Sequence, residues 1–317
     1  MPTLSVRFPG SLGADLAARL DMPALPPRAF ALFAHCFTCS KDSKAATFVS
    51  SALAEQGIAV LRFDFTGLGA SEGDFSDTGF SSNVADLVAA ADWLRGNHGA
   101  PAILIGHSLG GAAVLAAAGR IAEVRAVATI GAPYEPAHVK GLLKSSVEEI
   151  AAKGEAEVEL AGRRFRIRRD FLEDLDAQSQ RKAIAGLRRA LLVMHSPVDD
   201  TVAIDNATGI FAAAKHPKSF VSLDTADHLS PAGKTRAMPP RFSPHGPRAT
   251  CPWPTRTALP GRREKWSSPK LARAALPRRS PRRAMRCART SRNQPAASDP
   301  RRDPTICSWQ VWAHAPR

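Results

Sequence analysis

Residues 102–111 read A-I-L-I-G-H-S-L-G-G, a short apolar run that breaks into the pattern G-x-S-x-G and leads into the small side chains of residues 112–119. This order predicts a buried strand, a sharp turn with Ser108 at its apex, and a helix. Gly106 and Gly110 lie two residues before and after the serine. Glycine is required there because strand and helix can approach each other closely only where side chains are missing. The turn strains the backbone of Ser108 and holds its hydroxyl beside a helix N-terminus, whose free amides favour negative charge. The motif therefore predicts a nucleophilic serine; the alternative is a glycine-rich turn that contains a serine by chance.

The charge of the chain divides it near residue 232. Residues 231–317 hold 20 basic and 3 acidic residues, 15 of the 25 prolines and four of the five tryptophans, whereas residues 1–230 hold 23 basic and 26 acidic residues. The net charge of +14 therefore comes from the C-terminal stretch, and the first part gives no reason to expect nucleic acid as a partner. Residues 233–317 show neither strand nor helix periodicity, which predicts a disordered, low-complexity basic tail.

Residues 1–232 are long enough for one α/β domain with a sizeable core. The N-terminus lacks an apolar run behind positive charge, and no stretch approaches the roughly 20 apolar residues of a membrane helix. This part holds only two cysteines, Cys36 and Cys39. We therefore expect a cytoplasmic protein without membrane association, in which these cysteines are reduced.

Short apolar runs alternate with helical patterns along the domain. Strands are expected at 4–8, 14–20, 30–35, 58–64, 102–105, 124–130, 190–195 and 219–223, and helices near 43–56, 84–94, 112–119 and 204–216. This alternation predicts a doubly wound, mostly parallel sheet with helices on both faces. Catalytic groups should then lie on loops at the carboxyl ends of the strands.

Three such loops carry the residues of a catalytic triad. Ser108 ends one strand, Asp199 follows the strand 190–195, and His228 follows the strand 219–223. The order Ser, Asp, His is the one expected when later loops serve a serine at such a turn. His228 would move the proton of Ser108, and Asp199 would orient the imidazole ring and stabilise its charged form. Asp199 stands where the turn begins and is favoured over Asp200, which remains the alternative.

Acyl transfer also needs two donors for the oxyanion. We expect them to be the backbone N–H groups of Leu109, directly after the nucleophile, and Phe37, in the loop after the strand 30–35. The same loop contains the pattern C-x-x-C at Cys36 and Cys39, which is typical of dithiol redox proteins. A redox function is therefore the main competitor, although two small buried thiols that line the loop explain the pattern equally simply.

Four segments resemble the α/β-hydrolase superfamily: H-C-F-T-C-S at 35–40, D-F-T-G-L-G-A-S at 64–71, G-H-S-L-G-G at 106–111 and H-S-P-V-D-D at 195–200. The chain looks most like the serine aminopeptidase-like half of bacterial fusion proteins in which an OsmC-like domain follows the hydrolase. The resemblance implies a hydrolase that needs neither metal nor cofactor. It also implies a cap over the site, a role that residues 134–188 fit, with helices at 144–153 and 171–185 and a hairpin at 158–168 between them. The charges of the cap are expected to form a solvated face.

Two features depart from the family pattern. Cys36 replaces the glycine that usually follows the histidine of the oxyanion loop, which predicts a weaker oxyanion hole. After His228, four prolines between residues 239 and 247 forbid the helix that normally closes such a domain. We interpret residues 233–317 as the product of a shifted reading frame, with a linker or a nucleic-acid-binding arm as alternatives.

Taken together, the sequence predicts a serine hydrolase that cleaves an ester, thioester or amide bond of a small acyl substrate through an acyl-enzyme. The alternatives are a redox or peroxidase-type protein that uses Cys36 and Cys39, an inactive relative of the hydrolases, and a nucleic-acid binder that uses the basic tail. The sequence identifies neither the substrate nor the oligomeric state.

Overall fold

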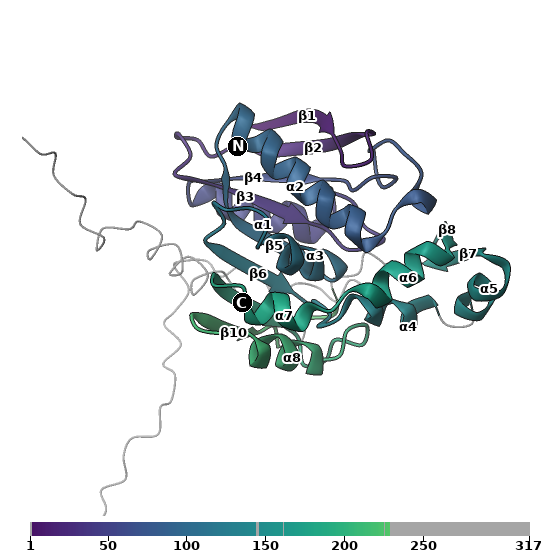
Figure 1. Cartoon of the computed structure of the whole chain (residues 1–317). Coiled ribbons are helices and arrows are strands. Elements are labelled where there is room, and N and C mark those ends of the chain that lie inside the picture. Colours follow the sequence, from purple (N-terminus) through teal and green to yellow (C-terminus); the bar gives the residue numbers. More distant parts are fainter. Residues whose placement is uncertain (1, 144–145, 161, 225, 229–317) are drawn as a thin grey trace, which may run out of the picture. The chain divides into compact units, whose positions relative to one another are not determined.

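The computed structural model describes residues 2–143, 146–160, 162–224 and 226–228 (Figure 1). An eight-stranded sheet forms the centre of this part, with strands in the order β1-β2-β4-β3-β5-β6-β9-β10. The strands are β1 (Thr3–Pro9), β2 (Asp15–Asp21), β3 (Ala29–Ala34), β4 (Ile58–Phe63), β5 (Pro101–His107), β6 (Ala126–Ile130), β9 (Ala190–His195) and β10 (Lys218–Ser222). The two pairs that β2 makes, with β1 and with β4, are antiparallel, and all the other pairs in this sheet are parallel. The predicted strands and the mostly parallel sheet are confirmed.

Helices cover the two faces of the sheet, because successive side chains of a buried strand point to opposite sides. In β3, Ala31 and Phe33 belong to the hydrophobic cluster that includes α1 (Lys44–Glu55). Leu32 and Ala34 belong to the larger cluster on the other face, which includes α2 (Phe80–Asn97), α3 (Leu109–Ala117) and α8 (Asp205–Ala213). The doubly wound architecture expected from the sequence is therefore present.

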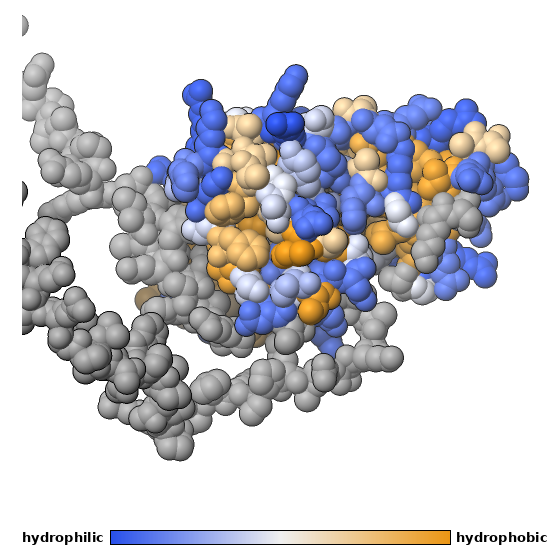
Figure 2. All heavy atoms as spheres, turned by 90° about the horizontal axis from the view of Figure 1, so that it is seen from below, coloured by the Kyte–Doolittle hydropathy of each residue, from blue (hydrophilic) through white to orange (hydrophobic). Residues whose placement is uncertain are grey.

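Burial differs sharply between the middle and the edge of the sheet. Every residue of β4 and of β6 is buried, and only Ala102 of β5 is not. At the edge, four of the five residues of β10 are exposed. Figure 2 shows hydrophobic surface among the hydrophilic side chains on the side where β10 and α8 lie, and the exposed apolar residues there include Phe220 and Val221.

The segment between β6 and β9 is an insertion with its own small elements. These are a 3₁₀ turn η2 (Pro136–Val139), α4 (Lys140–Leu143), α5 (Ser146–Lys153), β7 (Glu155–Leu160), β8 (Arg163–Arg168), α6 (Arg169–Ala177) and α7 (Gln180–Ala185). The strands β7 and β8 form an antiparallel hairpin between the helices, as predicted. In β7, three glutamates are exposed and alternate with buried apolar residues, which confirms that the charges form a solvated face.

Among the described residues, no helix is long and apolar enough to cross a membrane. The basic tail that we predict at 233–317, and the segment that replaces the closing helix, lie outside the described residues.

Candidate active site

Ser108 lies in a turn that only a close approach of strand and helix can form. It joins β5 to α3 with φ of 54°, and its N–H donates a hydrogen bond of 2.9 Å to the carbonyl oxygen of Ile130. A Cβ atom on Gly106 would lie 2.3 Å from the carbonyl oxygen of Gly110, and one on Gly110 would lie 2.3 Å from that of His35. Larger residues at these two positions would push the helix off the sheet, so the glycines permit the strained conformation of the serine.

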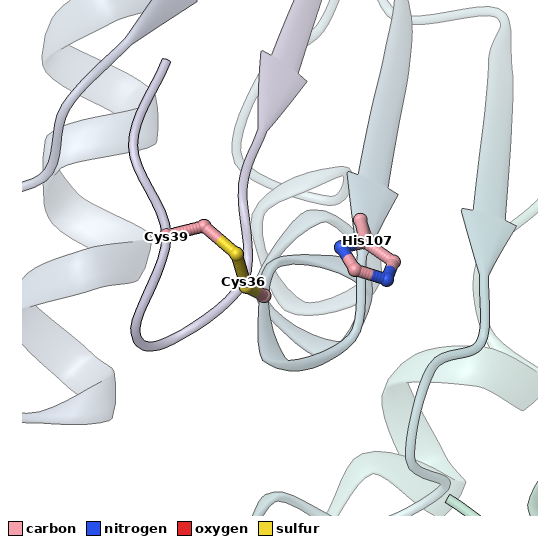
Figure 3. A group of neighbouring side chains, drawn as sticks. All are labelled: Cys36, Cys39 and His107. Carbon is pink, nitrogen blue, oxygen red and sulfur yellow. A yellow bond between two sulfur atoms is a disulfide. The ribbon is translucent and has the colours of Figure 1, made fainter. Parts of the chain in front are cut away.

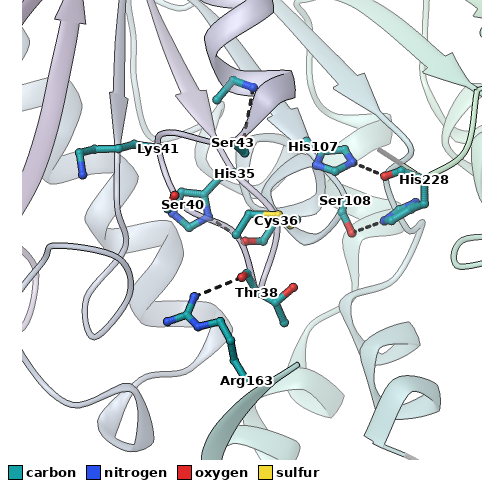
Figure 4. Close-up of a disulfide and its surroundings, with 12 residues drawn as sticks. His35, Cys36, Thr38, Ser40, Lys41, Ser43, His107, Ser108, Arg163 and His228 are labelled. Carbon is teal, nitrogen blue, oxygen red and sulfur yellow. Dashed lines mark hydrogen bonds between the residues drawn. A yellow bond between two sulfur atoms is a disulfide. The ribbon is translucent and has the colours of Figure 1, made fainter. Parts of the chain in front are cut away.

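The structure brings the three predicted triad residues together, and Figure 4 shows two of them, Ser108 and His228, joined by a hydrogen bond. The hydroxyl oxygen of Ser108 lies 3.0 Å from Nε2 of His228, and Nδ1 of His228 lies 2.7 Å from Oδ2 of Asp199. If the hydroxyl donates to Nε2, Nδ1 carries the ring hydrogen and donates it to the carboxylate. A serine, a base within hydrogen-bond reach and a group that orients the base form the geometry of an activated nucleophile.

Asp199 is fixed on both of its oxygens. While Oδ2 faces His228, Oδ1 accepts hydrogen bonds from the backbone N–H groups of Val202 at 2.8 Å and Thr201 at 3.0 Å. Burial raises the pKa of Asp199, but the hydrogen bonds from His228, Val202 and Thr201 outweigh it, so the pKa lies below its ordinary value. Asp200 is exposed and its carboxylate accepts a bond from the hydroxyl of Thr201, so the geometry supports Asp199 as the acid.

His107 has a role that sequence reasoning missed. From its position beside the nucleophile we expect core packing, with the side chain directed away from the pocket. It is indeed buried, but its Nε2 lies 2.9 Å from the carbonyl oxygen of His228, and the two rings are 5.1 Å apart. Burial lowers the pKa of His107 to about 4, so its ring is neutral near pH 7. A neutral His107 thus anchors the backbone of the residue that faces Ser108.

Gly131 is a second residue that the motifs did not single out. It follows β6 with φ of +52°, and a Cβ atom there would lie 3.2 Å from Oδ2 of Asp199 and 3.3 Å from Nδ1 of His228. A side chain at this position would crowd the hydrogen bond between these two residues. Its sequence signal is only that a glycine directly follows a buried strand.

The loop after β3 lies close to the N-terminus of α3. Neither its Phe37 N–H nor the N–H of Leu109 donates to another described residue, and the oxyanion role of both groups stays a prediction. The loop is held by His35, whose Nδ1 donates to the carbonyl oxygen of Cys36 at 2.7 Å. From β8 of the insertion, Arg163 donates to the carbonyl oxygen of Thr38 at 3.3 Å.

The side chain of Phe37 joins this loop to the insertion. Its ring lies 5.2–6.2 Å from the rings of Phe75, Phe165 and Phe171, and all four side chains are buried. Phe165 lies on β8 and Phe171 on α6, so the insertion packs directly against the loop. This contact holds the insertion beside the loop that carries Phe37, and the cap role expected for residues 134–188 stays a prediction.

A buried ion pair between Lys41 and Asp64 holds the end of the loop that follows β3. Nζ of Lys41 lies 2.7 Å from Oδ2 of Asp64, and Oδ1 of Asp64 accepts the backbone N–H of Lys41 at 2.6 Å. Gly69 approaches so closely that a Cβ atom would lie 2.2 Å from Oδ2 of Asp64. The segment D-F-T-G-L-G at 64–69 therefore folds around a carboxylate that fixes the loop, a role that its sequence alone did not indicate.

The expectation of two reduced cysteines is wrong for this structure. Cys36 and Cys39 form a disulfide with Cα atoms 5.2 Å apart, because the turn of the loop brings the two residues together. Within the described part of the chain, one group of side chains could ligate a metal ion, namely Cys36, Cys39 and His107 (Figure 3). Cys36 is not among the residues with positive φ, so it replaces the usual glycine of the family without backbone strain.

Comparisons with known proteins place the chain in a family. The sequence model described as "Alpha/beta hydrolase family" matches residues 31–242, and the chain belongs to this family. The crystal structure of the esterase domain of a Rhodothermus marinus protein is 53% identical to the chain, with a TM-score of 0.59. That alignment covers 73% of this chain and 92% of the other.

More distant structures share the fold alone. Est1E from Butyrivibrio proteoclasticus with bound ferulic acid is 20% identical, with a TM-score of 0.58 over 72% of this chain and 92% of that one. Mouse alpha/beta hydrolase domain-containing protein 10 is 20% identical, with a TM-score of 0.56 over 71% of this chain and 90% of that one. None of the curated proteins matches the sequence significantly.

Proposed function

We propose that the protein is a serine esterase in which Ser108, His228 and Asp199 form the catalytic triad. The observation that carries this proposal is the continuous pair of hydrogen bonds from Ser108 through His228 to Asp199, at 3.0 and 2.7 Å. The oxygen of Ser108 attacks the acyl carbon while Nε2 of His228 takes the hydroxyl proton. The N–H groups of Phe37 and Leu109 stabilise the negative charge on the former carbonyl oxygen.

The reaction then proceeds in two halves. His228 returns its proton to the leaving alkoxide, which departs as an alcohol and leaves an acyl-enzyme on Ser108. A water molecule, deprotonated by His228, attacks this ester and releases the carboxylic acid. Asp199 keeps its negative charge throughout and stabilises the charged imidazole, in agreement with the lowered pKa of its carboxyl group.

We favour an ester over an amide substrate because the 53% identical relative is described as an esterase domain. The aminopeptidase-like interpretation of the sequence shares the same triad and remains the second candidate. A panel of an aryl acetate, an aryl thioacetate and an aminoacyl anilide separates them, with the Ser108→Ala variant as control. We expect the ester to be cleaved fastest and the variant to be inactive on all three. Faster cleavage of the anilide would contradict esterase specificity, and full activity of the variant would contradict the triad.

The redox alternative receives less support from the structure. Cys36 and Cys39 are only 8% and 6% exposed, and thiol exchange with another protein needs an accessible sulfur. Ester cleavage that depends on Ser108 and survives reduction of the disulfide would separate the two functions.

We propose further that residues 1–232 form the hydrolase domain, and that residues 233–317 stand where related fusion proteins continue with an OsmC-like domain. The abrupt change of composition near residue 232 supports this division. Translation of the coding DNA beyond codon 232 in the other two frames tests the shifted frame. A helix followed by an OsmC-like sequence is expected, and its absence from both frames would contradict the proposal.

A further inference from the structure

Three side chains that bind soft metal ions meet beside the candidate active site, and the proposed hydrolysis uses none of their ligand atoms. Cys36 and Cys39 lie in the loop after β3, and His107 ends β5 (Figure 3). The two sulfur atoms and one ring nitrogen of His107 all lie within 4.8 Å of one another. In a tetrahedral Zn²⁺ site, bonds of about 2.3 Å to sulfur and 2.0–2.1 Å to nitrogen place the ligand atoms roughly 3.5–4 Å apart. The ring nitrogen of His107 is thus already near both sulfur atoms, while the two sulfur atoms are bonded to each other and would have to separate on reduction.

The ring of His107 is held in the form that can ligate a metal. Its Nε2 lies 2.9 Å from the carbonyl oxygen of His228, and because a carbonyl only accepts, Nε2 carries the hydrogen. Nδ1 then keeps a free lone pair. Figure 4 shows the hydrogen-bonded nitrogen on the side of His228, and Figure 3 shows the other nitrogen facing Cys36. A metal-bound histidine characteristically donates its other N–H to a carbonyl or carboxylate in this way.

We propose that reduction of the disulfide turns this cluster into a binding site for a thiolate-seeking divalent cation of the Zn²⁺ type, with Cys36, Cys39 and Nδ1 of His107 as its ligands. A small-molecule dithiol, rather than another protein, supplies the two electrons and two protons that convert the disulfide into two thiols, and is itself oxidised to a disulfide. The cation then displaces the two thiol protons. Three protein ligands leave a fourth position for water.

Burial and charge favour a cation at this place once the disulfide is open. His107 is only 2% exposed, as closed off from solvent as the two cysteines are. A buried pair of thiolates is costly without a counter-charge, whereas a divalent cation neutralises both. Lys41, a buried lysine of the same loop, is already paired with Asp64 at 2.7 Å and cannot take this role. The proposal does not depend on the hydrolase function.

Cobalt binding to the full-length chain tests the proposal. The three cysteines of the C-terminal stretch, Cys251, Cys287 and Cys307, are first replaced by serine, so that the loop holds the last two thiols. The protein is reduced with a trialkylphosphine, separated from it without oxygen, and titrated with Co²⁺. We expect one equivalent to bind with a thiolate-to-cobalt charge-transfer band, which Zn²⁺ then removes. The oxidised protein should show no band.

Variants distinguish this site from adventitious binding. His107→Gln keeps an amide nitrogen near the position of Nε2 but has no lone pair at Nδ1, and should bind Co²⁺ at least about 100-fold more weakly. Cys39→Ser should lose the stoichiometric band, while Ser108→Ala should bind Co²⁺ like the parent chain. Circular dichroism of the metal-free proteins checks that each variant folds.

Three results would overturn the proposal. They are reduced protein that binds no stoichiometric cobalt, equal affinity in the His107→Gln variant, and a disulfide that stays closed in excess phosphine. Because the oxidised and reduced forms of one chain are compared, the test remains decisive if a variant misfolds. It is also separate from the ester assays, whose failure would leave the metal site untouched.

Discussion

The serine and the histidine of the candidate triad are positioned by different parts of the sheet. Ser108 follows β5, a central strand that is buried on both faces, and the backbone of its turn is fixed by close packing around Gly106. His228 follows the edge strand β10, most of which is exposed. It is held by contacts at its own position, with Asp199, Ser108 and the side chain of His107. The centre of the sheet thus positions Ser108 through the backbone, whereas His228, at the edge, is positioned through hydrogen bonds that involve side chains.

The largest expected effect on activity comes from removing the side chain of Ser108 or of His228. Ser108→Ala and His228→Ala should each lower kcat for an aryl ester by about 10⁴-fold or more, because serine and base act as one unit. The double variant should lose little beyond either single one. Steady-state kinetics on the purified variants measures this, and a variant that keeps a tenth of the parent turnover would show that its residue is not catalytic.

The next largest effect on kcat should distinguish Asp199 from its neighbour Asp200. Asp199→Asn should lower kcat by about 10⁴-fold, since the amide cannot stabilise the charged imidazole of His228. Asp200→Asn is the matched control, because this exposed carboxylate makes no contact with the histidine, and it should stay within about twofold of the parent. Equal losses in both variants would contradict the assignment of Asp199.

Truncating a side chain should lower the free energy of unfolding more in the central strand β5 than in the edge strand β10. Leu104→Ala on β5 removes a fully buried side chain and should lower the free energy of unfolding by about 2–5 kcal/mol. Phe220→Ala on β10 removes a side chain that is 45% exposed and should cost less than about 1 kcal/mol. Urea unfolding of both variants gives the comparison. A larger cost at Phe220 would mean that the edge is as tightly packed as the centre.

His107, which holds the backbone of His228, should make the free energy of unfolding depend on pH. The unfolded chain takes up a proton on His107 near pH 6.5, but the folded protein does so only near 4, because the ring is buried. Between these values the unfolded state binds more protons, so stability falls as the pH drops from 6.5 to 4, by up to about 3 kcal/mol from this group. His107→Gln should flatten the slope of unfolding free energy against pH in this window. An unchanged slope would show that His107 is not titrating in this way.

The sequence predicted the central part of the molecule well and its supporting contacts less well. The elbow at Gly106–Gly110 and the alternation of strands and helices are local patterns, so they could be recognised without coordinates. The disulfide between Cys36 and Cys39 depends on how the loop turns, and the pattern C-x-x-C is compatible with thiols as well. The bonds of His107 to the backbone of His228 and of Asp64 to Lys41 join residues that are distant in sequence. Nothing in the local pattern of either residue indicates its partner.

Labelling with a fluorophosphonate, followed by peptide mapping by mass spectrometry, tests the central claim most directly. The probe reacts only with a serine that is activated by a base and placed beside oxyanion donors. We expect one adduct per chain, on Ser108, and no adduct in the His228→Ala variant. An unlabelled Ser108 in folded protein, or an adduct at another residue, would contradict the assignment of this site.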